Sequence, residues 1–101
     1  MSGPIDIESK QRYRQQKERL IKKMLFLGHQ MGYDKPDPTN RAEQLMDTKR
    51  LNWNNVERWC KSEKCAIRKT LNGYTVEELA KVVTQFELVY ESFKKSYARR
   101  S

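Results

Sequence analysis

The residue types that most often carry out catalysis or hold metals are sparse in this sequence of 101 residues. It contains one histidine, His29, and two cysteines, Cys60 and Cys65. A hydrolytic triad would need His29 beside a nucleophile and a carboxylate, but the sequence has no Gly-x-Ser-x-Gly, no phosphate-binding glycine loop and no paired catalytic carboxylates. We therefore expect a protein that is not an enzyme and needs no cofactor, with His29 at a surface or boundary position.

The two cysteines are the remaining candidates for metal binding or redox chemistry. Their Cys-x4-Cys spacing lies at the edge of the range for zinc ligands, and a second ligand pair is missing. A disulfide would need an oxidising compartment and a bend between the two residues. We predict no metal site, with Cys60 as a small core residue and Cys65 half-buried.

Positive charge is the strongest functional signal in the sequence. The chain has 21 Lys and Arg against 13 Asp and Glu, which gives a formal net charge of +8. Residues 1–33 and 94–101 each carry +4, whereas 34–93 is balanced, so the excess lies at the two ends. Such an excess attracts polyanions and favours a nucleic acid or an anionic membrane as partner. A basic surface without a partner is the alternative.

A cluster of cations in the middle of the chain is the clearest candidate for binding a nucleic acid. Cations supply salt-dependent contacts to phosphates, and the amides of Asn52, Asn54 and Asn55, shortly before the cluster, have the chemistry to read base edges. Two short helices joined by a turn are also compatible with a helix-turn-helix. A solvated face between helices is the alternative. We predict a nucleic acid as partner, DNA first, bound by Lys61, Lys64, Arg68 and Lys69 and assisted by Arg12, Arg14, Lys22 and Lys23.

The C-terminal part of the chain offers a second kind of surface. Tyr90, Phe93 and Tyr97 extend an apolar face beyond what a small domain covers, which predicts binding of a protein partner or of a second copy of the chain. The opposing expectation is that the first helix covers this face as an antiparallel neighbour. No membrane partner is expected, because the basic and apolar halves of the first helix follow one another instead of lying on opposite sides.

One long helix carries the three candidate partner-binding residues. From Thr75 to Tyr97, apolar residues recur at steps of three and four, which is typical of a helix with one buried face. Thr75 and Glu78 form a capping box at its start, because each side chain can bind the backbone amide of the other residue. A helix with such a face must bury it, so we expect the preceding segments to fold against it.

Three further helices are predicted before it. A glycine ends the first, two prolines forbid a helix just beyond, and an Asn72-Gly73 turn precedes the last helix. The predicted bounds are Ile7–Met31 for the first helix, with Gly32 beyond its end, Thr39 as cap to Thr48 or Arg50 for the second, and Asn52 or Trp53 to Glu63 for the third.

The fold class that follows is all-α, a small bundle of about four helices in which two long terminal helices flank two short middle ones. We predict a single domain over residues 1–101, with 1–8 flexible and 98–101 frayed. The expected core is Leu20, Ile21, Met24, Leu27, Leu45, Val56, Trp59, Ile67, Leu71, Leu79, Val82, Val83, Phe86, Val89 and Phe93.

The apolar runs of the sequence are short. None has the length of a secretory signal or of a membrane-spanning helix. The sequence therefore predicts a cytoplasmic protein with reduced thiols.

The segment from Lys69 to Phe93 resembles the C-terminal part of small proteins encoded in Mu-type transposable prophages, including regulators of the Mu late operon. The shared features are a basic helix that ends at glycine, Arg19–Gly32, and a Leu71 turn followed by Thr75, Glu78 and Leu79. The resemblance implies a small phage or mobile-element protein that acts in gene regulation. The middle segment departs from that pattern, so no functional residue is transferred.

Overall fold

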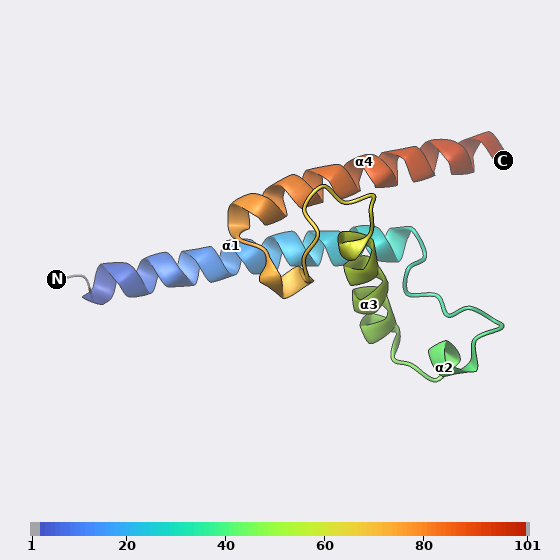
Figure 1. Cartoon of the computed structure of the whole chain (residues 1–101), viewed down its shortest axis with the longest axis horizontal. Helices are drawn as coiled ribbons and strands as arrows, with labels where there is room; N and C mark the ends of the chain where they lie inside the picture. Colours follow the sequence, from blue (N-terminus) through green and yellow to red (C-terminus); the bar gives the residue numbers. More distant parts are fainter. Residues whose placement is uncertain (1–2, 101) are drawn as a thin grey trace.

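The computed structural model describes residues 3–100, with side chains described for residues 10–97. Every regular element in that range is helical, which confirms the predicted all-α fold with two long helices around short middle ones (Figure 1). The elements are α1 (Gly3–Gln30), α2 (Arg41–Gln44), α3 (Thr48–Lys61), the 3-10 turn η1 (Leu71–Gly73) and α4 (Val76–Arg100). The flexibility predicted for residues 1–8 and the fraying predicted for 98–101 concern residues outside the described side chains.

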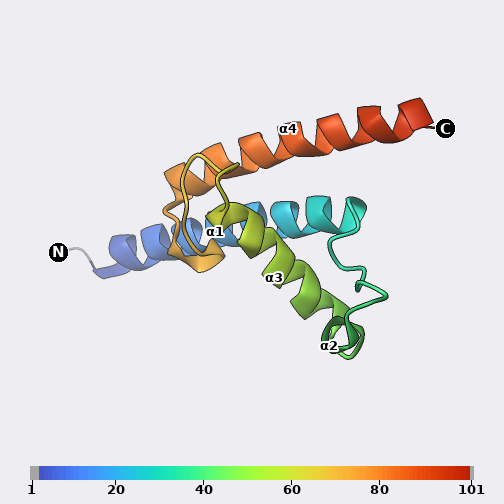
Figure 2. The same cartoon turned by 45° about the vertical axis from the view of Figure 1, so that its right-hand side comes forward.

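The two long helices lie side by side and run in the same direction (Figures 1 and 2). Two contacts fix their register. The Val76 backbone N–H donates to the Tyr13 hydroxyl at 3.2 Å, and the Lys23 ammonium lies 3.1 Å from the Glu87 carboxylate. The paired residues are 63 and 64 positions apart, so the expected antiparallel packing is wrong. The segment between the helices is long enough to carry the chain back to the starting end of α1.

The core lies between α1, α3, η1 and α4. Ten of the predicted core residues are buried, namely Ile21, Met24, Leu27, Val56, Trp59, Leu71, Leu79, Val82, Val83 and Phe86. The predicted Leu20, Ile67 and Val89 pack against this core and are half-buried. Leu51 and Tyr74, which were not predicted, are also buried, and Cys65 is buried instead of half-buried.

Two predicted core residues are exposed. Leu45 is 81% exposed, because it follows the single turn of α2, a helix that buries no residue. Phe93 is 38% exposed and lines two open hollows of the surface, one of them with Met31 and Tyr33 of the turn after α1.

The start of α2 differs from the prediction because of a local turn. The side chain of Asp37 accepts hydrogen bonds from the backbone N–H and the hydroxyl of Thr39, at 2.9 and 2.8 Å. With Thr39 engaged in this turn, Asn40 caps α2 instead and accepts from the Glu43 N–H at 3.2 Å. The helix that was expected to reach Thr48 or Arg50 is a single turn, Arg41–Gln44, and Thr48 and Arg50 belong to α3.

α3 begins earlier than predicted. Asp47 is its N-cap, and its side chain accepts from the Lys49 N–H at 3.1 Å. The helix thus gains one turn before Asn52 and places Leu51 in the core, where it is 3% exposed. It ends at Lys61, two residues before the predicted end at Glu63.

The C-terminal end of α1 has the predicted geometry. Gly32 has a φ of +82°, a conformation that glycine adopts without strain. The Tyr33 N–H donates to the Gly28 carbonyl at 2.8 Å and the Gly32 N–H to the His29 carbonyl at 3.0 Å, so the last carbonyls of the helix are satisfied.

The capping box at the start of α4 is also confirmed. The Glu78 N–H donates to the Thr75 hydroxyl at 3.2 Å, and the Thr75 N–H donates to the Glu78 carboxylate at 3.0 Å. These bonds satisfy backbone donors that the first turn of a helix cannot pair internally.

The helices α1 and α3 lie very close together at Gly28. A Cβ atom at this position would lie 2.6 Å from the Val56 side chain and 2.7 Å from the Asn52 side-chain oxygen. Beside this contact, the Asn52 amide donates to the Leu25 carbonyl at 2.8 Å. The crossing therefore depends on a residue without a side chain.

The molecule is elongated, with extents of 58 × 31 × 22 Å and a radius of gyration of 16.2 Å. A compact domain of 100 residues has a radius of gyration of about 13 Å. The difference arises because the parallel helices are staggered, so that the N-terminal turns of α1 and the last turns of α4 extend past each other (Figure 1). Among the described residues, no helix is both long and apolar enough to cross a membrane.

Candidate nucleic-acid interface

The connection between α3 and η1, residues 62–70, carries three of the predicted nucleic-acid-binding residues, and α4 holds it in place. The Gln85 side chain accepts from the Ala66 N–H at 3.0 Å and donates to the Lys64 carbonyl. The Ser62 hydroxyl donates to the Trp59 carbonyl at 2.6 Å, which completes the end of α3. The backbone at Lys64 is thus fixed although the segment has no regular structure.

Beneath the connection, Tyr74 anchors the chain from inside the core. Its side chain is 1% exposed, and its hydroxyl donates to the Ile67 carbonyl at 2.5 Å. The same oxygen lies 3.6 Å from the Cys65 sulfur. Burial raises the pKa of the Tyr74 hydroxyl and raises the pKa of the Cys60 thiol to about 11. Both groups are therefore protonated at neutral pH, as expected for structural side chains and not for reactive ones.

The four central cations are not equivalent. Lys64 and Arg68 are exposed, and neither forms an ion pair with another side chain in the described range. The Lys61 ammonium lies 3.8 Å from the Glu57 carboxylate, and the Lys61 side chain is exposed. Because water weakens such a pair, Lys61 remains able to attract an external anion. Lys69 differs, because its ammonium contacts both oxygens of Glu78 at 2.8 and 2.9 Å and keeps the pKa of that carboxyl below its usual range.

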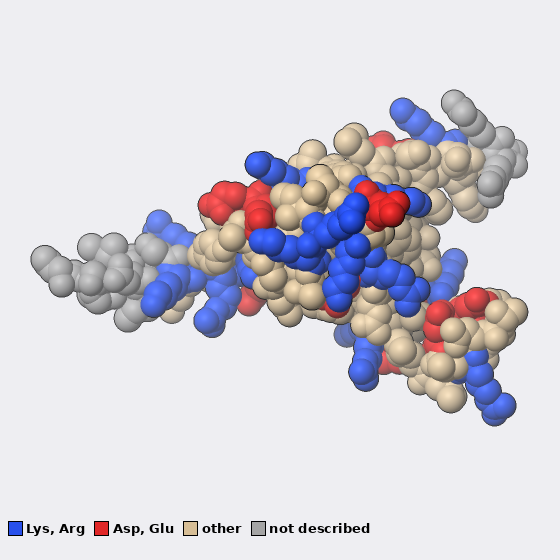
Figure 3. Space-filling view, in the orientation of Figure 1, with Lys and Arg blue, Asp and Glu red and all other residues tan. Residues whose placement is uncertain are grey.

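Arg58 belongs to the same surface, although sequence reasoning missed it. It lines a hollow of about 300 Å³ together with Lys64, Tyr33 and Trp59. Its position three residues before Lys61 on α3 is the signal that places both on one side of the helix. We call Arg58, Lys61, Lys64 and Arg68 the α3 basic surface. Figure 3 shows Lys and Arg side chains gathered over this end of α3 and the following connection.

The asparagines at the start of α3 do not form a base-reading surface. Asn52 is 8% exposed and donates to the Leu25 carbonyl, while Asn55 donates to the Tyr33 carbonyl at 2.7 Å. Both amides therefore tie α3 to the end of α1. The exposed Asn54 contacts the sulfur of Met46 at 3.7 Å. The predicted role of these amides is corrected to a structural one for Asn52 and Asn55.

The four assisting cations on α1 lie on different sides of the helix. Arg12 and Arg14 are two positions apart and so point in nearly opposite directions. Lys22 is exposed, whereas Lys23 is paired with Glu87 on α4. The structure does not bring these four residues together as one site.

Arg14 instead forms a stripe with two cations that were not predicted. Lys10, Arg14 and Lys17 are spaced by four and three residues and line a hollow of about 660 Å³ beside Tyr13. The Lys17 ammonium also donates to the Asn72 carbonyl at 2.7 Å, which ties α1 to η1. We call these three residues the α1 basic stripe. Figure 3 shows further Lys and Arg side chains over the N-terminal half of α1.

His29 and the cysteines offer no catalytic arrangement. His29 is exposed and its ring contacts the carboxylate of Asp34 in the turn after α1. Cys60 and Cys65 are both buried and free. Among the described residues, no group of three or more His, Cys, Asp or Glu side chains is placed to hold a metal ion.

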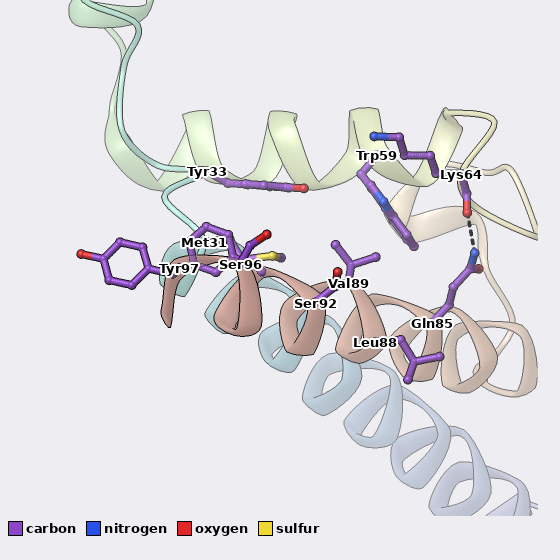
Figure 4. A pocket seen from close by; sticks show the side chains of 11 residues that line it. Met31, Tyr33, Trp59, Lys64, Gln85, Leu88, Val89, Ser92, Ser96 and Tyr97 are labelled. Atoms are coloured by element: carbon purple, nitrogen blue, oxygen red, sulfur yellow. Dashed lines mark hydrogen bonds between the residues drawn. The ribbon is translucent and has the colours of Figure 1, made fainter. Parts of the chain in front are cut away.

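Two of the three predicted partner-binding residues, Phe93 and Tyr97, line an open groove along α4, and Tyr90 lines a neighbouring hollow. Tyr90 is half-buried, with the Lys94 ammonium 4.8 Å from its ring centre. Phe93 and Tyr97 stack at 6.2 Å and are 38% and 69% exposed. The groove has a volume of about 690 Å³ (Figure 4). It is lined by Met31, Tyr33, Trp59, Lys64, Gln85, Leu88, Val89, Ser92, Phe93, Ser96 and Tyr97.

No protein-family profile, curated protein or solved structure matches this chain. What the protein does must therefore be inferred from its own residues and their arrangement.

Proposed function

We propose that this protein is a non-enzymatic nucleic-acid-binding accessory or regulatory protein that holds phosphate groups on the α3 basic surface. The observation that supports this most directly is the state of Lys64 and Arg68. Both are exposed and without an ion pair among the described side chains, on a connection whose backbone Gln85 fixes. Cations on a fixed backbone lose less conformational entropy when a phosphate binds.

Part of the charge at this place has a structural use, and that part must be separated from the rest. Arg58 and Lys61 lie in the last turn of α3, where cations offset the partial negative charge of the helix end. Lys64 and Arg68 follow the helix and are not needed for that purpose. A surface that keeps two further cations beyond the helix end is better suited to an external anion than to the helix alone.

The α1 basic stripe enlarges the surface available to a polyanion. Its Lys17 bonds the Asn72 carbonyl of η1, and η1 directly follows the connection that carries Lys64 and Arg68. A nucleic-acid backbone has many phosphates in a row, so separate groups of cations on one protein can contact the same nucleic-acid chain. The resemblance of the Lys69–Phe93 segment to Mu-type prophage regulators points toward the same kind of activity.

A salt titration tests this proposal. We expect the full chain to bind random-sequence duplex DNA, measured by fluorescence anisotropy, with an affinity that falls steeply as salt rises. Four phosphate contacts would give a slope of log K against log salt of about −3.6 for duplex DNA. The variant Lys61→Glu/Arg68→Glu should lower the magnitude of this slope by about 2 and weaken binding to all sequences alike.

The matched control is Lys49→Glu/Arg50→Glu, which makes the same change of net charge at the other end of α3. Its slope should stay close to that of the unchanged protein. Equal losses in the two variants would show that only net charge matters, and an absence of binding at low salt would refute the proposal. Parallel titrations with single-stranded DNA and RNA identify which polyanion binds best.

A further inference from the structure

We propose that the groove along α4 binds an amphipathic helix of a partner protein whose polar face carries acidic side chains. This inference does not rest on nucleic-acid binding. It starts from the floor of the groove, which is a single continuous face of α4 from Gln85 to Tyr97. At a rise of 1.5 Å per residue, this face is about 18 Å long and matches a helix of three to four turns.

The shape of this face suits a helix. Ser92 and Ser96 are four residues apart in the middle of the face, with Leu88 on one side and Phe93 and Tyr97 on the other. Small residues between large ones form a channel into which the side chains of a second helix fit. Figure 4 shows Tyr33 and Trp59 facing the α4 side chains across the opening, so the channel has a wall as well as a floor.

The channel is apolar and open to solvent. Leu88 is 66% exposed and Tyr97 is 69% exposed. Tyr97 continues the line of the buried Phe86 at helical spacing, whereas Leu88 lies on the solvent side of α4, at the outer edge of the groove. Exposed leucine and tyrosine side chains around one hollow are typical of a surface that another chain covers. Binding of a helix through apolar residues at steps of three and four is a common way to cover such a groove.

The charges around the channel select the chemistry of the occupant. Lys64 lines one end of it, beside Gln85. A second hollow that shares Phe93 and Tyr97 with the groove is lined by Lys35 and by Lys94, whose ammonium pairs with Glu91 at 3.1 Å. Lys64 and Lys35 form no ion pair with a described side chain, so they are the cations that face an occupant. No carboxylate lines either hollow within the described part of the chain. A helix with glutamates or aspartates flanking its apolar face is therefore complementary, whereas a basic one is repelled.

A second copy of this chain is a poorer occupant. Each copy carries a net charge of +8, and residues 94–101 alone contribute four of these charges without an acid. Two copies joined at this end would bring like charges together, which opposes association at low salt. Self-association through the groove is therefore an outcome that would contradict the proposal.

Two synthetic peptides of 14 residues provide the probe. Both have leucines at helical spacing on one face, and they differ only in carrying glutamate or lysine at the remaining positions. Binding to the full-length protein is measured by fluorescence anisotropy of a label on the peptide. We expect the glutamate peptide to bind with a dissociation constant of roughly 10–100 μM and the lysine peptide to bind at least about tenfold more weakly.

Substitutions in the groove show whether binding occurs there. Leu88→Ala and Leu88→Glu should each weaken binding of the glutamate peptide, the second by about tenfold or more, because an exposed anchor is lost without disturbing the core. Thr48→Glu, which adds the same charge at the exposed first residue of α3, away from the groove, should change it by less than about twofold. Circular dichroism checks that each variant keeps its helices.

Several results would overturn the proposal. These are equal affinity for the two peptides, an absence of binding by the glutamate peptide, loss of affinity in Thr48→Glu equal to that in Leu88→Glu, or self-association that Leu88→Glu abolishes. The Leu88 variants should bind DNA as the unchanged protein does. A negative result with the peptides therefore contradicts only the groove proposal, and a negative salt titration contradicts only the proposal of nucleic-acid binding. Lys64 is left unchanged in both tests, because it belongs to the α3 basic surface and also lines the groove.

Discussion

At the scale of single residues, two glycines at the end of α1 do different things. Gly32 takes a positive φ that the sequence position, just after an amphipathic helix, allowed us to predict. Gly28 lies within α1 and has no positive φ. It matters because Val56 and Asn52 of α3 occupy the space that a Cβ at this position would need. A contact between segments separated by more than twenty residues leaves no local signal, so Gly28 was not predicted.

Replacing Gly28 by alanine should destabilise the protein, whereas a glycine-to-alanine change in a helix usually stabilises it. A Gly→Ala change inside an exposed helix stabilises by about 0.5–1 kcal/mol. At this crossing, the added methyl group overlaps with Val56, so we expect Gly28→Ala to lower the free energy of unfolding by about 1–3 kcal/mol. Urea denaturation followed by circular dichroism measures the change.

A double-mutant cycle provides the control for this prediction. Val56→Ala removes the methyl group nearest to the new Cβ, so Gly28→Ala should cost less in that background. If Gly28→Ala instead stabilises the protein, the close approach of α1 and α3 at this residue is refuted.

The same distinction between local and distant partners explains the result for the candidate cations. The clustering of Lys61, Lys64 and Arg68 along the chain was visible in the sequence, and in the structure Lys64 and Arg68 are exposed and form no ion pair with a described side chain. The neutralisation of Lys69 by Glu78 was not, because the partner comes from the next helix. The scatter of Arg12 and Arg14 follows from helix geometry alone and was foreseeable from their spacing.

At the scale of the helices, the start of a helix was predictable where the sequence offers a single strong capping motif. The Thr75 and Glu78 box is complete in the sequence, and both of its hydrogen bonds form. At the start of α2, Thr39 and Asn40 are both good caps, and the Asp37 turn decides between them. Periodicity predicted the buried faces of α1 and α4, but α2 is too short to have a buried face at all.

The capping box makes a measurable contribution to stability. Thr75→Ala removes the hydroxyl that accepts from the Glu78 N–H and should lower the free energy of unfolding by about 1 kcal/mol. Thr84→Ala is the control in the same helix, because Thr84 is exposed and its hydroxyl bonds only the Ala80 carbonyl. That control should be neutral or slightly stabilising, since alanine has the higher helix propensity. A Thr75→Ala variant as stable as the unchanged protein would contradict the capping role.

The same box predicts a pH dependence. The hydrogen bonds from Lys69 and from Thr75 lower the pKa of Glu78 from 4.5, so its carboxylate stabilises the folded state above that pH. This contribution is lost as the pH falls through the lowered pKa. Glu78→Gln should therefore be less stable than the unchanged protein at pH 7, and the difference should shrink at acid pH, which urea titrations at several pH values would show.

At the scale of the whole molecule, the parallel arrangement of α1 and α4 is the feature that no local pattern announced. The sequence shows that both helices have apolar faces, but not which ends meet. Their orientation is set by the connections through α3 and η1, which return the chain to the side where α1 begins (Figure 2). The stagger that results exposes the groove at the end of α4, which is why Phe93 was wrongly assigned to the core.

A charge swap tests the parallel register directly. Lys23→Glu places two acids side by side and should lower the free energy of unfolding by about 0.2–1 kcal/mol at low salt. Adding Glu87→Lys should restore the lost stability, because the ion pair is formed again with the two charges exchanged. Lys22→Glu, one residue away and exposed, is the control. An antiparallel pair of helices would show no such rescue in urea denaturation.

The register of 63 residues between partner positions also has a consequence for synthesis of the protein. The ribosome releases the apolar face of α1 long before it makes the face of α4 that covers it. At about 5–20 residues per second, this gap lasts about 3–13 s. During that interval a nascent α1 offers an uncovered hydrophobic stripe to chaperones or to neighbouring chains, and slower translation of the segment between the helices should increase aggregation.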